Sequence, residues 1–132
     1  MPEIVFIRVG FDDKPAAPKI NTPWGTADYV EELADGIIQV GTPTHGGIGV
    51  KHKVAAKRLS AAARTEAIDQ YDHLWFEEDC DWAIVCHEIP ELFSKQHREM
   101  AARSLARWNQ RYLERRLAGP GKTTVGRELS NG

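Results

Sequence analysis

Residues 29–42, with the sequence YVEELADGIIQVGT, decide the fold. Two apolar segments, Tyr29 to Leu33 and Ile37 to Thr42, flank the tripeptide Ala34-Asp35-Gly36. An Asp-Gly pair readily adopts the positive φ angles that a tight turn between two strands requires. The stretch therefore predicts a β-hairpin, and the rest of the chain is interpreted around it.

Three further elements are predicted on either side of this hairpin. Ile4 to Val9 is a short apolar run rich in β-branched side chains, which is typical of a buried strand. Lys51 to Ile68 is rich in good helix formers and has apolar residues at three- and four-residue steps, which predicts a helix. Residues 81–89 could form a strand or a helix. In a strand the apolar even positions from Cys80 to Cys86 would share one face, with Asp81 and His87 on the other, which favours a strand from Trp82 to His87.

The last predicted element is a long amphipathic helix that begins at Pro90 and ends before Gly119-Pro120-Gly121. Its apolar stripe comprises Ala101, Leu105, Trp108 and Tyr112, and its basic stripe, on roughly the opposite face, comprises Arg103, Arg107, Arg111 and Arg115. Residues 95–132 hold nine basic and three acidic side chains, although the whole chain has a net charge of −2. Such asymmetry indicates a charged partner rather than a particular fold.

Together these elements predict an α+β domain, with a small, mainly antiparallel sheet covered by two helices, one of them the long basic C-terminal helix. A chain of 132 residues that is 42% hydrophobic fits a single domain, which we place at residues 1–121, with residues 122–132 as a flexible tail. No segment approaches the roughly 20 apolar residues of a membrane span, and two cysteines are too few for a disulfide framework. We therefore expect a soluble, cytoplasmic protein without a membrane partner.

The tetrapeptide Thr44-His45-Gly46-Gly47 contains the best candidate for a functional side chain, His45. Two glycines let the backbone approach a ligand, and they precede the helix predicted from Lys51, whose N-terminal amides would favour an anion. We predict Gly46 and Gly47 as an anion-binding loop, with His45 as a candidate catalytic base. The alternative is a tight structural loop whose histidine hydrogen-bonds a backbone carbonyl.

Three consecutive carboxylates, Glu77, Glu78 and Asp79, form a second candidate cluster. Close like charges raise the pKa of at least one acid or attract a cation. One of these acids could orient or deprotonate His45, so all three are candidate catalytic residues together with it. The alternative is that they are solvated acids that cap the following element. The spacing of histidines and cysteines fits no metal site, and no cofactor is predicted.

The four arginines of the basic stripe are the predicted partner-binding residues. Guanidinium groups bind nucleic-acid phosphates and acidic protein surfaces equally well. No aromatic residue interleaves the stripe and the rest of the chain is acidic, so a protein or ribonucleoprotein partner is favoured over direct nucleic-acid binding. The alternative is a solvated helix face stabilised by pairs such as Glu99 with Arg103.

Six motifs, taken in order, resemble an uncharacterised domain family found in phage, plasmid and proteobacterial proteins. They are Thr22-Pro23-Trp24-Gly25, Val30-Glu31-Glu32-Leu33, Gly36-Ile37, Thr44-His45-Gly46-Gly47, Glu77-Glu78-Asp79-Cys80-Asp81-Trp82-Ala83 and Pro90-Glu91-Leu92-Phe93. The resemblance implies an origin on a mobile element, where small proteins often counter host defence. It brings no catalytic residue with it.

We therefore expect a non-enzymatic phage or mobile-element protein that binds and inhibits a host defence complex, as anti-CRISPR proteins do. Its interface would be the arginine stripe or the acidic middle region, inside the host cell. The alternative is a small hydrolase or transferase in which His45 acts as base, an acid from residues 77–79 orients it, and the amides of Gly46 and Gly47 hold an oxyanion. A third alternative is a purely structural accessory domain.

Overall fold

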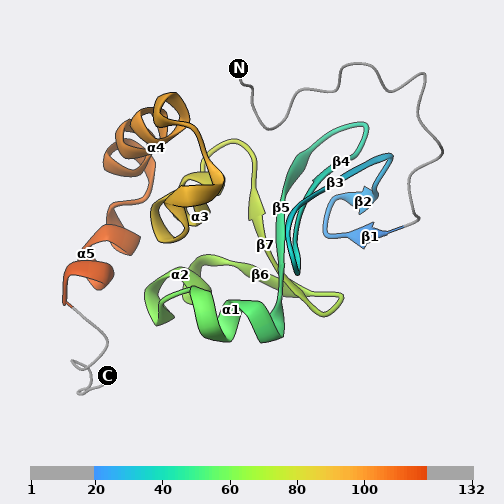
Figure 1. Cartoon of the computed structure of the whole chain (residues 1–132), viewed down its shortest axis with the longest axis horizontal. Helices are drawn as coiled ribbons and strands as arrows, with labels where there is room; N and C mark the ends of the chain where they lie inside the picture. Colours follow the sequence, from blue (N-terminus) through green and yellow to red (C-terminus); the bar gives the residue numbers. More distant parts are fainter. Residues whose placement is uncertain (1–19, 119–132) are drawn as a thin grey trace.

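The computed structural model describes residues 20–118 of the chain (Figure 1). The strand predicted from Ile4 to Val9, the tail predicted over residues 122–132 and both limits of the predicted domain lie outside these residues. The described part is α+β, as predicted, with antiparallel strands on one side and helices on the other.

A five-stranded antiparallel sheet has the strand order β3-β4-β5-β7-β6. Its members are β3 (Tyr29–Ala34), β4 (Ile37–Gly41), β5 (Gly46–Lys51), β7 (His73–Glu77) and β6 (Ile68–Gln70). Strands β3 and β4 confirm the predicted hairpin, and Gly36 at its turn has a φ of 80°, which glycine adopts without a steric cost. Strand β5 was not predicted, and it lies in the centre of the sheet.

A short hairpin covers one face of this sheet. It consists of β1 (Asn21–Thr22) and β2 (Gly25–Thr26), joined by the Thr-Pro-Trp-Gly motif. The hydroxyl of Thr22 accepts from the backbone N–H of Trp24 and donates to the carbonyl of Gly25, which fixes the turn. The turn places Trp24 edge-on against Trp75, with ring centroids 5.9 Å apart, and so closes a small apolar cluster on this face.

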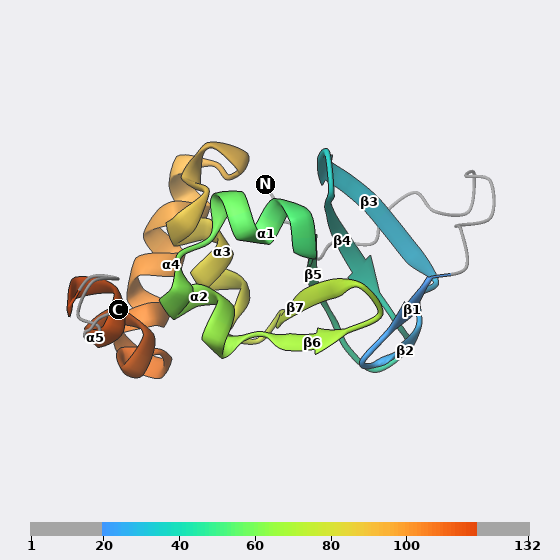
Figure 2. The same ribbon diagram turned by 90° about the horizontal axis from the view of Figure 1, so that it is seen from below.

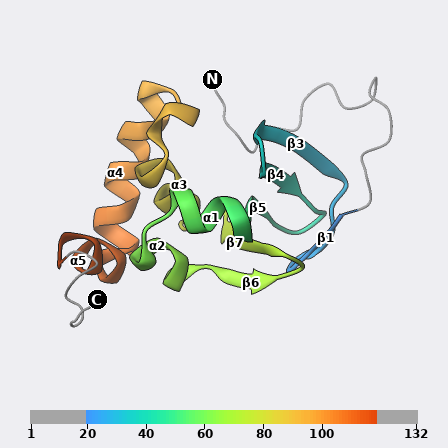
Figure 3. The ribbon, with the colours of Figure 1, turned by 60° about the horizontal axis from the view of Figure 1, so that its bottom comes forward.

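The helices cover the opposite face, and α1, α2 and α3 lie between the sheet and α4 and α5 (Figures 2 and 3). Their bounds are α1 (His52–Arg58), α2 (Ala61–Glu66), α3 (Trp82–Glu88), the 3₁₀ turn η2 (Pro90–Leu92), α4 (Lys95–Trp108) and α5 (Gln110–Ala118). The main core forms where these helices meet the sheet, and its largest side chains include Phe76, Ile84, Ile89, Leu105 and Tyr112.

The strand predicted from Trp82 to His87 is wrong, because this segment is helix α3. All five residues from Trp82 to Cys86 are buried, since α3 contacts both the sheet and α4. A helix buried on every side has no polar face, so its sequence shows no helical period and a chance alternation resembles a strand.

The helix predicted over residues 51–68 is interrupted. Lys51 belongs to β5, and the chain leaves α1 at Leu59 in an extended conformation. Ser60 then caps α2, because its hydroxyl accepts from the backbone N–H of Ala63 at 3.1 Å. A serine at an N-cap starts a new helix, and this divides the predicted element in two.

The C-terminal helix also differs from the prediction. Pro90 starts the short turn η2, and α4 begins later, at Lys95, where the hydroxyl of Ser94 accepts from the N–H of His97. Asn109 ends α4, with a φ of −125° and a ψ of 40°, and its side chain donates to Asp81 at 3.0 Å. This contact with the start of α3 accompanies a break in the helix, so the basic segment is two helices rather than one.

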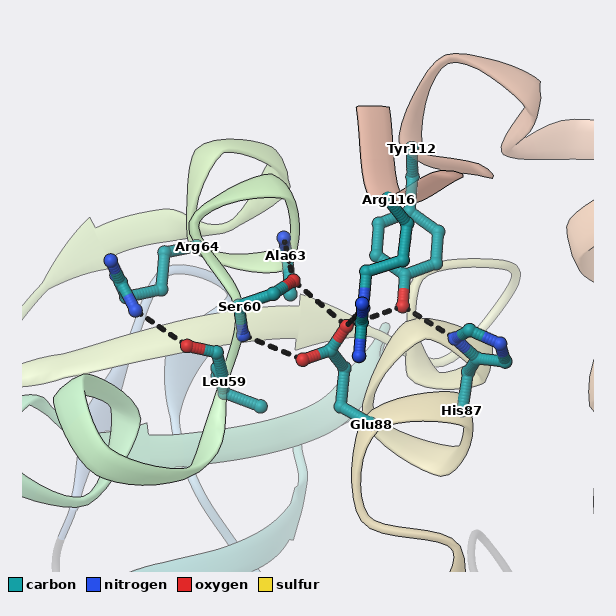
Figure 4. A network of polar contacts seen from close by, with 8 residues as sticks. All are labelled: Leu59, Ser60, Ala63, Arg64, His87, Glu88, Tyr112 and Arg116. Carbon is teal, nitrogen blue, oxygen red and sulfur yellow. Dashed lines mark hydrogen bonds and ion pairs between the residues drawn. The ribbon is translucent and has the colours of Figure 1, made fainter. Parts of the chain in front are cut away.

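A buried polar network fastens α5 to α2 and α3 (Figure 4). At its centre is Glu88, whose carboxylate accepts from the backbone N–H and the hydroxyl of Ser60, from the hydroxyl of Tyr112 and from Nε of Arg116. The Tyr112 hydroxyl also lies 2.6 Å from Nδ1 of His87. Burial alone would raise the pKa of Glu88, but these hydrogen bonds together lower it, so the buried carboxylate is ionised and fully partnered.

Candidate functional site

The structure brings the predicted His45 loop and the acidic run to the same end of β5. Nδ1 of His45 lies 3.7 Å from Oε2 of Glu77, and the backbone N–H of Glu78 donates to the carbonyl of Gly46 at 2.9 Å. Trp24, from the first motif, lies against Gly47. Three motifs that are far apart in the sequence therefore meet around two glycines.

Gly46 and Gly47 do not form the predicted loop, because they are the first two residues of the buried strand β5. The helix that follows begins only at His52. Each glycine is required by its neighbours, since a Cβ at Gly46 would lie 2.9 Å from Oε1 of Glu78 and one at Gly47 would lie 2.5 Å from the Trp24 ring. The carboxylate of Glu78 lies over Gly46, in the space that an anion bound to this glycine would need.

The His45–Glu77 contact is partly open to solvent, with 48% of the His45 side chain and 28% of the Glu77 side chain exposed. Burial raises the pKa of Glu77, the nearby charge of Asp79 raises it further, and His45 opposes them. Asp79 itself is exposed. Of the predicted catalytic residues, then, His45 and Glu77 are adjacent to each other, and Glu78 points to the opposite side of β5, over Gly46.

A cavity of about 210 Å³ opens beside Glu78 on the helix-facing side of the sheet. Its walls are formed by β3, by the end of β4 and by the connection to β5, with the lining residues Tyr29, Gln39, Val40, Gly41, Thr42, Pro43, Thr44, His45 and Glu78. Strand register places Tyr29, Gly41 and Gly46 side by side on one face. Gly46 has no side chain there, and the carboxylate of Glu78 fills the space over it.

Gln39 is the polar group of this cavity that the sequence analysis missed. Its residue is 1% exposed, and neither its amide nitrogen nor its amide oxygen has a hydrogen-bond partner. A buried amide without partners is rare and costs free energy. The signal in the sequence was a lone polar residue in the apolar strand Ile37–Gly41, on the same face as the core residue Ile37.

The two cysteines take no part in this arrangement. Cys80 is half-buried in the turn before α3, where burial, followed by the charge of Asp81, raises the pKa of its thiol. Cys86 is buried in α3, and burial raises its pKa to about 11. Both are therefore protonated at neutral pH, which makes them poor nucleophiles.

The four arginines of the predicted basic stripe form two pairs with different contacts. Arg111 makes a two-point contact with the carboxylate of Glu66 in α2, at 2.9 and 3.0 Å, and Arg115 lies 3.7 Å from the same carboxylate. Both arginines therefore hold α5 against α2. Among residues 20–118, Arg103 and Arg107 of α4 form no ion pair, and the Glu99–Arg103 pair considered above is not formed.

An exposed aromatic residue lies beside these two arginines. Trp108, predicted to be in the apolar stripe, is 62% exposed, because the helix breaks directly after it and the buried positions are taken by Leu105 and Tyr112. The guanidinium carbon of Arg107 lies 5.1 Å from the centre of its ring. Met100, one turn before Arg103, is also exposed. We call Met100, Arg103, Arg107 and Trp108 the α4 face.

Comparison with known proteins gives a family but no function. A family model described as "Domain of unknown function (DUF7007)" matches residues 17–128. The chain belongs to this family. No curated protein and no solved structure matches the chain.

The match to DUF7007 includes every residue that the structure describes, so the cavity, the Glu88 network and the α4 face all lie within the DUF7007 domain. In residues 20–118 of this domain, no group of three or more His, Cys, Asp or Glu side chains is placed to hold a metal ion. No helix in this range combines the length and apolar character that crossing a bilayer would require.

Proposed function

We propose that this DUF7007 protein is a non-enzymatic binding protein that engages an acidic surface of its partner through the α4 face. The observation on which the proposal rests is Trp108, a large aromatic side chain left 62% exposed beside two arginines without ion pairs. Tryptophan and arginine are the residue types most enriched where interfaces have their binding energy.

The position of the α4 face supports this role. In the view from below, α4 and α5 lie at the end of the molecule farthest from β1 and β2, so a partner could reach them without touching the sheet (Figure 2). The guanidinium of Arg107 over the Trp108 ring orders both side chains before binding, which reduces the entropy lost on association. A positive surface on a protein with a net charge of −2 also selects acidic partners by steering.

For the partner, we propose a host protein or ribonucleoprotein complex that acts in defence against mobile elements, which the protein would inhibit inside the host cell. This part of the proposal rests on the family resemblance of the motifs, whereas the α4 face supports binding in general. Direct binding to nucleic acid is less favoured, because acidic side chains outnumber basic ones among the described residues outside the C-terminal helices and would repel phosphates.

Charge reversal on the α4 face tests the proposal. Arg103→Glu with Arg107→Glu should abolish capture of the partner from a lysate of the host cell, read by mass spectrometry, while the circular dichroism spectrum stays unchanged. Arg111 is left intact, because it holds α5 in place through Glu66. The matched control is Lys53→Glu with Lys57→Glu on α1, which changes the same charge on another exposed surface. Equal capture by both double variants would contradict the proposal.

A second candidate function is a small hydrolase or transferase that uses His45 as base and Glu77 to orient it. It is favoured by the 3.7 Å approach of these side chains at the rim of a cavity. In that case His45→Ala should abolish turnover of a substrate and leave partner capture unchanged. Loss of capture with unchanged turnover in the arginine variant, and the reverse in His45→Ala, would show that the protein has both activities.

A further inference from the structure

The break between α4 and α5 is one residue long. Helix α4 ends at Trp108, α5 begins at Gln110, and Asn109 between them leaves the helical conformation. Residues 95–118 contain no glycine or proline, the two residues that interrupt a helix by their own backbone properties. The break therefore depends on contacts that the two helices make with the rest of the molecule.

Polar groups at the break are paired less well than in a continuous helix. Oδ1 of Asn109 is buried without a hydrogen-bond partner, although the amide nitrogen of the same side chain donates to Asp81. The carbonyl of Ala106 accepts from the side-chain amide of Gln110 at 3.1 Å, whereas in a continuous helix it would accept from the backbone N–H of that residue. The bent arrangement thus has a cost at Asn109, which the docking of α5 must offset.

Helix α5 is docked mainly through hydrogen bonds and ion pairs. Of its nine residues, Tyr112 is the one that is buried. The hydroxyl of Tyr112 donates to Glu88, which also accepts from Arg116 (Figure 4). Contacts of this kind can be exchanged for equivalent contacts with a partner, whereas a large buried apolar surface cannot.

Glu66 occupies two arginines of the basic stripe. Arg111 contacts its carboxylate at two points, and Arg115 lies 3.7 Å from it. One negative charge therefore faces two positive charges. The side chains of Arg111 and Arg115 are 69% and 48% exposed, so the carboxylates of a partner can reach them. Glu66 lies where a carboxylate of an acidic partner would bind.

A continuous helix over residues 95–118 would present a different basic surface. In the bent arrangement Arg103 and Arg107 lie on α4, while Arg111 and Arg115 contact Glu66 on α2. Side chains four residues apart lie on the same side of a helix. Straightening would therefore place all four arginines along one face, over a length of about 18 Å.

We propose that α5 is an autoinhibitory helix. An acidic segment of the partner protein replaces Glu66 and Glu88, α5 is released, and α4 and α5 join into one helix whose four arginines bind the segment. This rests on the proposed function and names the chemistry of the partner, which needs several carboxylates within about three helical turns. The free protein stays bent, because release exposes Tyr112 and breaks the Glu88 network. The apparent affinity is then reduced by the small fraction of released molecules.

Binding of a fluorescein-labelled polyglutamate peptide of about 12 residues to the full-length protein tests this by fluorescence anisotropy, at about 50 mM salt. Tyr112→Phe removes a hydroxyl that docks α5 and changes no charge. It should bind the peptide about two- to tenfold more tightly than the native protein, because weaker docking enlarges the released fraction. Tyr29→Phe, which removes a hydroxyl from the sheet, is the matched control and should bind like the native protein.

NMR of the ¹³C,¹⁵N-labelled native protein follows the break itself. Saturation with the unlabelled peptide should move the Cα chemical shift of Asn109 into the helical range. The amide signals of Ser60 and His87, which lie in the network that docks α5, should also shift. This measurement decides the matter on the native chain if Tyr112→Phe is not folded.

Three results would overturn the inference. They are equal or weaker binding by folded Tyr112→Phe, an unchanged Asn109 signal at saturation, and tighter binding of an oligothymidylate of the same length than of polyglutamate. If the peptide saturates the native protein while α5 stays docked, the inference falls and the proposed function stands. Absence of peptide binding to both proteins also overturns the inference, and lysate capture by Arg103→Glu with Arg107→Glu then decides the proposed function separately.

Discussion

Glu88 and Gln39 are both almost completely buried, with 2% of the Glu88 side chain and 1% of Gln39 exposed, yet their surroundings are opposite. The carboxylate of Glu88 accepts four hydrogen bonds from Ser60, Tyr112 and Arg116. The amide of Gln39 has none. The helical side of the molecule therefore satisfies a buried charge, while the sheet side leaves a neutral amide without partners.

The difference separates a buried polar group that is fully paired from one that is not. A polar network that is complete has no capacity for a ligand, and its value is to fix how helices pack. A buried amide that lacks both partners lowers stability unless something else pairs with it. Removing the polar group should therefore lower stability at Glu88 and leave it unchanged or raise it at Gln39. The following changes are ordered from the largest expected effect to the smallest.

The largest effect is expected for Glu88→Gln. The substituted amide keeps the shape but places an N–H₂ group among donors, so the free energy of unfolding should fall by about 2–4 kcal/mol. Urea denaturation measures this loss. The control Glu91→Gln removes the exposed partner of Arg58 and should cost less than about 1 kcal/mol. Similar small losses for both variants would show that the Glu88 network contributes little.

The same substitution has a defined pH dependence. The hydrogen bonds to Glu88 lower its pKa below the ordinary value of 4.5, so the network stabilises the fold above that pH. The contribution is lost as the pH falls through the folded pKa. The difference in free energy of unfolding between the native protein and Glu88→Gln should therefore be constant at about neutral pH. It should shrink as the pH falls below 4.5, the ordinary pKa of a glutamate.

Gly46→Ala tests the floor of the cavity. The new Cβ would lie 2.7 Å from the carbonyl oxygen of Val40 and 2.9 Å from Oε1 of Glu78, and the carbonyl cannot move without disturbing the sheet. We expect a loss of about 1–3 kcal/mol in the free energy of unfolding, measured with urea. Thr44→Ala, at the exposed rim of the same turn, should change it by no more than about 0.5 kcal/mol.

Removing a single tyrosine hydroxyl in each region is a smaller change that allows the same comparison. Tyr112→Phe removes a buried hydroxyl that donates to Glu88 and should cost about 0.5–1.5 kcal/mol, less than Glu88→Gln because Ser60 and Arg116 keep their acceptor. Tyr29→Phe removes a hydroxyl that donates to the exposed Glu31 and should cost less than about 0.5 kcal/mol. Thermal or urea unfolding of both variants checks the order, and a larger loss for Tyr29→Phe would reverse it.

The smallest effect should have the opposite sign. Burial, and then the charge of Asp79, raise the pKa of Glu77, so its ionised form destabilises the fold. Glu77→Gln should therefore increase the free energy of unfolding at pH 7 by less than about 1 kcal/mol. The gain should vanish as the pH falls below the unfolded value near 4.5, where both forms are neutral. A loss of stability at pH 7 would mean that the contact with His45 dominates.

The sequence predicted the fold class and the β3–β4 hairpin, because an Asp-Gly turn between apolar segments is a local signal. Strand β5 was missed, since a strand with glycine at positions 46, 47 and 49 has weak local preference. Its structure depends on distant residues, because the rings of Trp24 and Trp75 fill the space over Gly47 and Gly49. The available signal was the two-residue spacing of Gly47 and Gly49, which places both on one face of a strand.

The sequence analysis grouped side chains that lie together in the structure, and their chemical role stays a prediction. His45 and Glu77 were grouped and are adjacent, because β5 and β7 pair in the sheet. The position of Glu78 over Gly46, which opposes an anion there, depends on that pairing and is not visible in the local sequence. The same holds for the arginines, since only the packing of α5 on α2 distinguishes Arg111 and Arg115 from Arg103 and Arg107.

Gln39→Met is the substitution that tests the contrast between the two regions most directly. Methionine has a similar length and no polar atom that needs a partner, so the free energy of unfolding without ligand should stay the same or rise by up to about 1–2 kcal/mol. Urea denaturation beside Glu88→Gln provides the reference for a polar group that is fully paired. A loss of more than about 1 kcal/mol in Gln39→Met would contradict the account, because it would show that the Gln39 amide is already paired within the fold.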